Sequence, residues 1–261
     1  MDAPIGLFDS GFGGLTVMKE FIRLLPKENL IYFGDTAHLP YGSKSPETVV
    51  RFARENSQFL MELGVKLLVI PCHTACCHAL DLLQKELPIP VIGVIDAGLT
   101  LIRPFSRIGL LGTTSTIESG LYQRLILKQN PEALIFAKAC PLFVPLVEEG
   151  FHEHESAHLI AKEYLKELKG NIDAALLACT HYPLIRTILE KEFGPHVALI
   201  EPALACAERA LKILKAKNQL NSQTKKPLYQ FYASDDPLKF QTLGKIFLGQ
   251  TVKKVEKNKK L

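Results

Sequence analysis

The chain has 261 residues, of which 47% are hydrophobic and 22% are charged, and its formal net charge at pH 7 is +4. This composition is typical of a globular protein with room for one large domain or two small ones. The small net charge, with no basic stripe interleaved with aromatic residues, argues against a nucleic-acid partner. No apolar run approaches the roughly 18 residues of a membrane span, which argues against a membrane role.

Six cysteines are present, but the first residues lack the basic and apolar regions of an export signal. We therefore expect reduced thiols and a cytoplasmic location. Much of the positive charge lies at the end of the chain, which we expect to be a solvated tail. The lysines concerned are Lys253, Lys254, Lys257, Lys259 and Lys260.

Short apolar runs, each followed by turn residues and an amphipathic stretch, recur along the chain. In chain order, the predicted strands are 5–8, 30–33, 67–70 and 91–94, and then 108–111, 133–137 and 174–178. Strands that alternate with helices in this way predict an α/β fold with mostly parallel sheets.

The second series of strands repeats the first. Residues 5–11 read IGLFDSG and residues 108–114 read IGLLGTT, each a strand that ends in a small polar loop. Residues 67–74 read LLVIPCHT and residues 175–181 read ALLACTH, so Cys72 and Cys179 occupy equivalent places. The repeat predicts two pseudo-symmetric α/β domains, with the active site in the cleft between them.

Ligands of open α/β sheets bind beyond the carboxyl ends of the strands, which would place one thiol on each wall of the cleft. A helix N-terminus after each cysteine favours the thiolate, which acts as a base. One thiolate and one thiol on opposite faces of a carbon could racemise an amino acid without a cofactor. The sequence shows no lysine in a Schiff-base setting and no convincing phosphate loop. It therefore gives no indication that a cofactor is needed.

Polar residues near the two cysteines are candidates for proton transfer and substrate binding. Asp9 and His181 could accept or relay a proton, and several hydroxyls could bind substrate carboxylates: Ser10, Thr74, Thr113, Thr116 and Thr180. The alternative for Asp9 and for each hydroxyl is a helix N-cap, a common use at such positions. For His181 the alternative is a supporting side chain outside the site.

A zinc site is the competing interpretation of the region after Cys72. Soft ligands are dense there, namely Cys72, His73, Cys76, Cys77 and His78. Structural zinc usually pairs two such clusters, and the chain has no second one, so we predict no metal.

Several motifs resemble those of the glutamate racemases of bacterial cell-wall synthesis, within the aspartate/glutamate racemase superfamily. They lie at 8–15 (FDSGFGGL), 34–36 (GDT), 40–42 (PYG), 111–116, 143–148 (FVPLVE) and 179–184 (CTHYPL). The resemblance covers nearly the whole chain. It implies interconversion of L- and D-glutamate by Cys72 and Cys179, without cofactor, to supply D-glutamate for peptidoglycan. A racemase of aspartate or another amino acid, or a non-catalytic ligand- or metal-binding relative, is the alternative.

The resemblance also assigns residues and domains. Glu148 and His181 match positions proposed to assist proton transfer, and Tyr41 and Gly42 join Asp9, Ser10, Thr74, Thr113, Thr116, Thr180 and His181 as substrate contacts. The chain would return to its first domain near 229–237, giving a discontinuous domain of 1–95 and 206–261 around a second of 96–205. A homodimer is common in the family. His73 departs from the family's asparagine, so a substrate-binding amide becomes an imidazole, which is larger and titrates near neutral pH.

Overall fold

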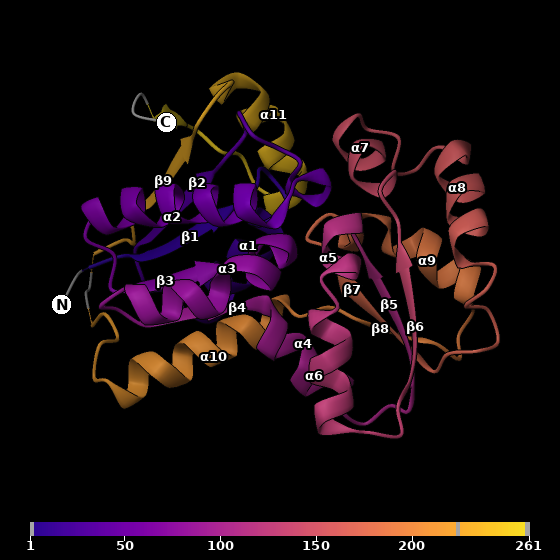
Figure 1. The fold of residues 1–261 in the computed structure, drawn as a ribbon. Helices are drawn as coiled ribbons and strands as arrows, with labels where there is room; N and C mark the ends of the chain where they lie inside the picture. The colour runs from indigo at the N-terminus through magenta and orange to yellow at the C-terminus, as the bar shows by residue number, and fades with distance from the viewer. Residues whose placement is uncertain (1–2, 223–224, 259–261) are drawn as a thin grey trace.

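The computed structural model describes residues 3–222 and 225–258 and shows two halves, each built on its own sheet (Figure 1). The first sheet contains β1 (Ile5–Asp9), β2 (Leu30–Gly34), β3 (Leu67–Ile70), β4 (Val91–Gly93), β9 (Tyr229–Ala233) and β10 (Glu256–Lys257). The second contains β5 (Arg107–Gly112), β6 (Leu134–Ala139), β7 (Ala174–Ala178) and β8 (Ala198–Ile200). All strand pairs are parallel, which confirms the predicted α/β fold.

The order of the strands confirms the internal repeat. The first sheet runs β10-β9-β2-β1-β3-β4 and the second β6-β5-β7-β8. The four strands β2-β1-β3-β4 therefore match β6-β5-β7-β8 one for one. Cys72 follows β3 and Cys179 follows β7, so the two cysteines occupy the same place in this order.

Helices surround both sheets. Those of the first half are α1 (Leu15–Leu24), α2 (Pro46–Glu62), α3 (His73–Glu86), α10 (Ala203–Ala216) and α11 (Pro237–Leu248). Those of the second are α5 (Thr114–Glu118), α6 (Leu121–Gln129), α7 (Phe143–Glu148), α8 (Glu155–Leu165) and α9 (Arg186–Phe193). Short 3₁₀ turns, η1 (Tyr41–Ser43) and η2 (Tyr182–Ile185), complete the set, and α4 (Val94–Ile102) lies between the halves.

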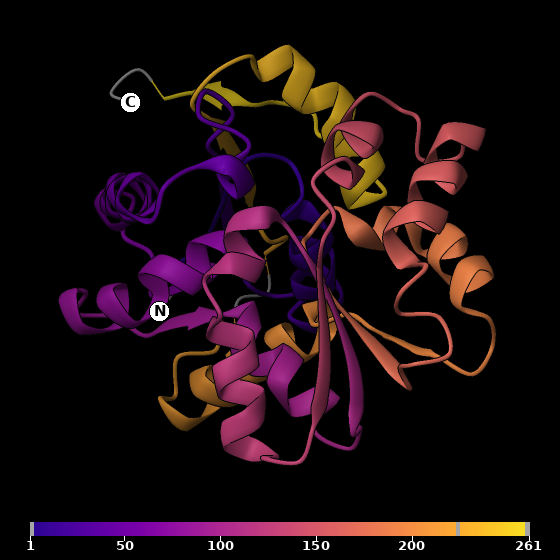
Figure 2. The same cartoon turned by 45° about the vertical axis from the view of Figure 1, so that its right-hand side comes forward.

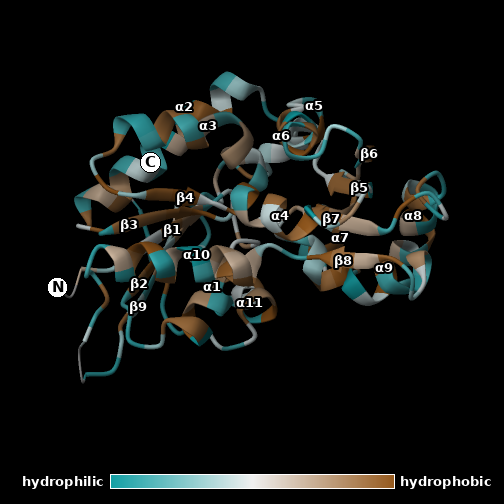
Figure 3. Cartoon of the chain, turned by 90° about the horizontal axis from the view of Figure 1, so that it is seen from below, coloured by the Kyte–Doolittle hydropathy of each residue, from teal (hydrophilic) through white to brown (hydrophobic). Residues whose placement is uncertain are grey.

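The central strands form the core because helices cover both faces of the sheets there, whereas β6 at the edge of the second sheet has no buried residue. In the first half, α2 and α3 cover one face while α1, α10 and α11 cover the other (Figure 3). Every residue of β1, β2, β3 and β7 is buried, as their uninterrupted apolar runs predict. Figure 2 shows the two halves side by side, and residues that follow β1, β3 and β7 line one cavity between them.

Two connections cross between the halves. Helix α4 leads from the first sheet to the second, and α10 leads back, after which β9 pairs with β2 in the register Leu30 to Tyr229. The predicted domain limits at 95/96 and 205/206 fall inside α4 and α10. Because α4 packs against α3 as well as against β7, it belongs to both cores, and the exact limits stay a prediction.

The structure departs from the elements predicted from the sequence at three places. Val94 begins α4 rather than ending a strand, because this helix is largely apolar and its first residues continue the apolar run of β4. Strand β8 gave no recognised signal, since it is short and only partly buried. The expected solvated end is only partly so: Lys253, Lys254 and Lys257 are exposed, but Val252 and Val255 are buried and β10 pairs with β9. Lys259 and Lys260 lie outside the described residues.

Within residues 3–222 and 225–258, no helix is both long enough and apolar enough to cross a membrane.

Candidate active site

The first wall of the cleft forms where β1 and β3 end. Cys72 caps the N-terminus of α3, and its sulfur accepts a hydrogen bond from the Ala75 N–H at 3.4 Å. The same thiol lies 3.7 Å from the Ser10 hydroxyl. Asp9, the last residue of β1, is fully buried nearby, and its Oδ2 accepts a hydrogen bond from the Gly11 N–H at 3.0 Å. A thiol, a hydroxyl and a carboxylate therefore meet on this wall.

The second wall forms at the end of β7. The Cys179 sulfur lies 4.0 Å from Nδ1 of His181, and Nε2 of that imidazole lies 2.9 Å from Oε1 of Glu148, at the end of α7. The His181 and Glu148 side chains are only 5% and 10% exposed, so this contact between imidazole and carboxyl group is shielded from water. The three side chains form a continuous path along which a proton could be relayed.

Both thiols are less acidic than the sequence predicts. Burial raises the pKa of Cys72 to about 12, and the negative charge of Asp9 adds to the effect. Burial likewise raises the pKa of Cys179 far above its ordinary value. The expected lowering by a helix N-terminus is wrong for the protein without substrate, because loss of solvation outweighs the dipole of α3. Cys179 precedes a 3₁₀ turn and not an α-helix, and the backbone N–H of His181 offsets only part of the effect of burial on its pKa.

Three threonine hydroxyls join the walls. Oγ1 of Thr113 accepts a hydrogen bond from the Thr116 N–H at 3.3 Å, which makes it the N-cap of α5. The Thr74 hydroxyl, on α3, lies 2.9 Å from that of Thr113 and 3.0 Å from that of Thr116. Capping and a place beside the cleft, weighed as alternatives in the sequence, therefore coexist in Thr113.

Tyr41 and Gly42 reach the cleft from the loop after β2, and Asp35 holds this loop. The Tyr41 hydroxyl donates to Oδ2 of Asp35 at 2.5 Å, while Oδ1 accepts from Ser234 at 2.8 Å and contacts Nδ1 of His38 at 2.8 Å. The sequence assigned Asp35 no role. The available signal was its position directly after a buried strand, where a fully buried carboxylate needs several donors.

The soft ligands after Cys72 diverge instead of meeting. Nδ1 of His73 lies 2.7 Å from the Tyr122 hydroxyl, the Cys76 thiol donates to the Ile70 carbonyl at 3.1 Å, and Nε2 of His78 lies 2.9 Å from the Ser115 hydroxyl. In the part of the chain that the structure describes, no group of three or more His, Cys, Asp or Glu side chains is placed to hold a metal ion.

One small cavity unites most of the predicted residues. It is lined by Ser10, Tyr41, Gly42, Cys72, His73, Thr74, Thr113, Glu148, Cys179, Thr180 and His181, among others. Asp9 and Thr116 lie behind this lining, each next to a residue that belongs to it. The cavity has a volume of only about 20 Å³, room for about one water molecule.

Comparison with known proteins identifies the family of this chain. Residues 5–210 match the family model described as Asp/Glu/Hydantoin racemase. The chain belongs to this racemase family. A glutamate racemase of Syntrophus aciditrophicus is 44% identical over 258 residues, which cover 97% of this chain and 96% of that protein. The chain is accordingly an amino-acid racemase, and its relatives match it over nearly their whole length.

Solved racemase structures share the fold. The glutamate racemase of Francisella tularensis, in complex with D-glutamate, has a TM-score of 0.94 and 40% identity, covering 98% of this chain and 97% of that one. The Thermus thermophilus glutamate racemase, in complex with beta-chloro-D-alanine, has a TM-score of 0.91 and 41% identity with the same coverage.

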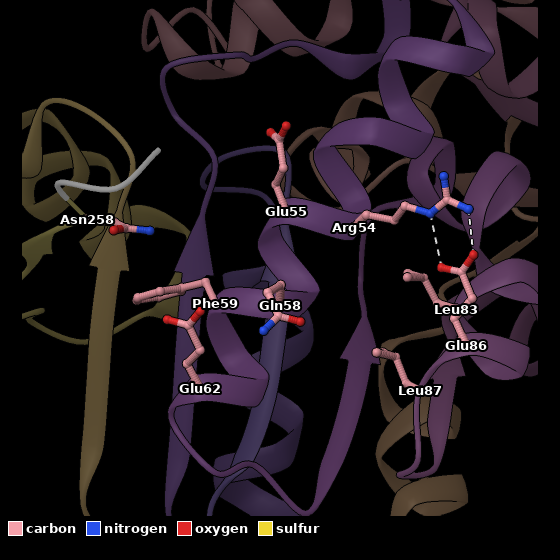
Figure 4. A pocket seen from close by; sticks show the side chains of 9 residues that line it. All are labelled: Arg54, Glu55, Gln58, Phe59, Glu62, Leu83, Glu86, Leu87 and Asn258. Atoms are coloured by element: carbon pink, nitrogen blue, oxygen red, sulfur yellow. Dashed lines mark hydrogen bonds and ion pairs between the residues drawn. The ribbon is translucent and has the colours of Figure 1, made fainter.

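A larger groove of the racemase, about 570 Å³, lies on the outer surface of α2 and α3 (Figure 4). Arg54 and Glu86 form an ion pair at one side of it, and Phe59 and Leu87 supply apolar surface. None of the described residues that line the groove is a cysteine, and the Arg54–Glu86 ion pair is exposed to solvent. The two cysteines predicted to act on the substrate line the small cleft cavity and not this groove.

Proposed function

We propose that this racemase interconverts L- and D-glutamate by a two-base mechanism in which Cys72 and Cys179 act on opposite faces of the α-carbon. The observation that carries the proposal is the pair of buried thiols, placed after equivalent strands of the two halves and lining one cavity. The glutamate racemase names of the relatives support the choice of substrate. The D-glutamate product would supply peptidoglycan synthesis.

The reaction moves one proton on and one proton off. One cysteine, as thiolate, takes the α-proton and becomes a thiol, which leaves the electron pair on the α-carbon and its carboxylate. The other cysteine, as thiol, gives its proton to the opposite face and becomes a thiolate. Each turnover therefore exchanges the protonation states of Cys72 and Cys179, and the reverse reaction restores them.

The residues behind each thiol assist these transfers. Glu148 holds the His181 imidazole, which can take the proton of Cys179 through Nδ1 or return it. Asp9 is the corresponding group beside Cys72, and burial raises the pKa of its carboxyl, which makes it a stronger base than an exposed aspartate. Each direction of the reaction then has its own thiol and its own supporting acid or base.

Hydrogen bonds and charge bind the substrate. Hydroxyls of Ser10, Thr74, Thr113 and Thr180 and backbone groups of Tyr41 and Gly42 would hold its two carboxylates, with Thr116 behind them and His73 in the lining. The substrate's ammonium group brings a positive charge into a cavity that otherwise disfavours thiolates. An opposite charge within a few ångströms favours the ionised form, so the ammonium group beside the thiols would lower their pKa while hydrogen-bond donors neutralise the effect of the two carboxylates.

Substrate entry requires the halves to separate. A glutamate molecule is far larger than the roughly one water molecule that the cavity accommodates. The cleft walls contact each other directly through Thr74, Thr113 and Thr116, so these hydrogen bonds must open before the substrate carboxylates replace them.

The test is circular dichroism of L-glutamate incubated with the protein in deuterated buffer, with L-aspartate as the comparison substrate. Loss of the signal together with deuterium at the α-carbon of D-glutamate is expected. Cys72→Ser and Cys179→Ser should each abolish racemisation, because each removes one of the two bases. A wild-type protein that neither racemises glutamate nor exchanges its α-hydrogen would falsify the proposal, and loss of activity in only one variant would indicate a single base.

A further inference from the structure

A hydrogen bond between two buried side chains crosses from one half to the other beside Cys72. Nδ1 of His73, the first residue of α3, lies 2.7 Å from the hydroxyl of Tyr122, on α6. His73 is 4% exposed and Tyr122 is fully buried. In the part of the chain that the structure describes, this is the only hydrogen-bond partner of the Tyr122 hydroxyl.

The chemistry of the pair fixes the direction of the bond. Burial raises the pKa of Tyr122 well above its ordinary value and lowers that of His73 to about 3, so both groups are neutral at pH 7. A buried hydroxyl proton needs an acceptor, and Nδ1 is the acceptor in reach. The hydroxyl therefore donates to Nδ1, and the imidazole carries its single proton on Nε2.

The bond belongs to a row of contacts between α3 and the second half. Thr74, the next residue, bonds the hydroxyls of Thr113 and Thr116, and one turn further on His78 bonds Ser115. The row therefore holds the beginning of α3 against α5 and α6. The N-terminus of α3 in turn contributes the Ala75 N–H that contacts the sulfur of Cys72.

We propose that Tyr122 is a positioning residue of the racemase, which holds the His73 imidazole as the Nε2–H tautomer and sets the place of Cys72 relative to the second half. Its effect on turnover rests on the proposed function. The imidazole then acts at the cavity edge as a neutral hydrogen-bond donor, the same capacity that an amide N–H has. Without the Tyr122 hydroxyl, Nδ1 would take the proton and Nε2 would become an acceptor, which repels a carboxylate.

The first measurement is independent of activity. Nitrogen-15 NMR of the protein without substrate, at pH 7, distinguishes protonated from unprotonated ring nitrogens, and His73→Asn identifies the signals of His73 by their absence. We expect Nδ1 unprotonated and Nε2 protonated, with Tyr122→Phe shifting the population toward Nδ1–H. A wild-type His73 protonated at Nδ1 would overturn the proposal, even if glutamate turned out not to be the substrate.

The second measurement is kinetic. Tyr122→Phe should lower kcat/KM about tenfold, the usual effect of leaving one buried polar group unpaired. The equilibrium constant of a racemisation is 1, so kcat/KM must fall equally for both enantiomers. The isotope effects of α-deuterated L- and D-glutamate need not agree. If Cys72 is displaced, the isotope effect should rise for the enantiomer that Cys72 deprotonates and fall for the other.

Matched variants separate positioning from general damage. Tyr164→Phe, which removes the hydroxyl that accepts from the Leu142 N–H in the second half, should leave kcat/KM and both isotope effects unchanged. In a protein that already carries His73→Asn, Tyr122→Phe should lower kcat/KM by much less than tenfold, because the imidazole that the Tyr122 hydroxyl contacts is absent. A wild-type-like Tyr122→Phe, or one with reduced kcat/KM and both isotope effects unchanged, would contradict a positioning role.

Discussion

Gly13 is the place where an added methyl group should keep the cleft from closing. It lies in the loop after β1, and a Cβ built on it would be 2.2 Å from Oγ1 of Thr180 and 2.6 Å from Nδ1 of His181. Ordinary contact begins near 3.4 Å, so Gly13→Ala must push the two walls apart by about 1 Å. Gly13 has no positive φ, so alanine introduces no backbone strain of its own.

Gly13→Ala should lower the rate of catalysis far more than it lowers the fraction of folded protein. A misplacement of about 1 Å costs roughly 100-fold in rate, equivalent to about 2.7 kcal/mol of transition-state stabilisation. We therefore expect Gly13→Ala to lower kcat/KM about 100-fold, while the free energy of unfolding, measured with urea, falls by about 1–3 kcal/mol, the usual effect of overpacking. Racemisation is followed by circular dichroism of both glutamate enantiomers.

Gly98→Ala is the matched control. Gly98 lies within α4, where a new Cβ would meet Leu176 and Pro202 at 3.3 Å or more, so activity should be unchanged. Gly13→Ala with more than half of the wild-type kcat/KM would show that the walls do not approach so closely in the active form, and the reasoning would be wrong.

Three further predictions concern buried polar groups. Lys66→Met should lower the free energy of unfolding, measured with urea, by about 3–5 kcal/mol, because Glu28, 2.6 Å from Lys66, then lies buried without its counter-ion. A loss below about 1 kcal/mol would argue against this reason. The double variant Lys66→Met with Glu28→Gln should recover stability. Because the pKa of Cys72 is raised to about 12, thiolate is scarce at neutral pH. Alkylation of the substrate-free protein should therefore keep increasing with pH beyond about 10, where an ordinary thiol with a pKa of about 8.5 is almost fully ionised. A plateau near pH 10, seen by mass spectrometry of the Cys72 peptide, would contradict the raised pKa. Asp35→Asn should lower kcat/KM about tenfold, because an amide cannot accept from all the donors that the carboxylate holds. Tyr41→Phe removes only one of these donors and should lower kcat/KM less. Equal kcat/KM in Asp35→Asn and wild type would show that Asp35 does not support the loop.

The sequence determined the fold and the two cysteines because their signals are local. Strands buried on both faces must be apolar throughout, so residues 67–70 and 174–178 were recognised without knowledge of their neighbours. The repeated strand order then placed Cys72 and Cys179 at equivalent ends. Strand β8 and the pairing of β10 gave no comparable signal, because their burial depends on elements far away in the sequence.

The tertiary structure alone decided the state of the site. A helix N-terminus predicts an acidic thiol, but the pKa of Cys72 is raised, because the second half closes over the sulfur and removes water. His73 looked like a free imidazole in place of an amide until the fold brought Tyr122 to its Nδ1. Solvation and long-range hydrogen bonds arise only when the two halves meet, and no local pattern in the sequence contains them.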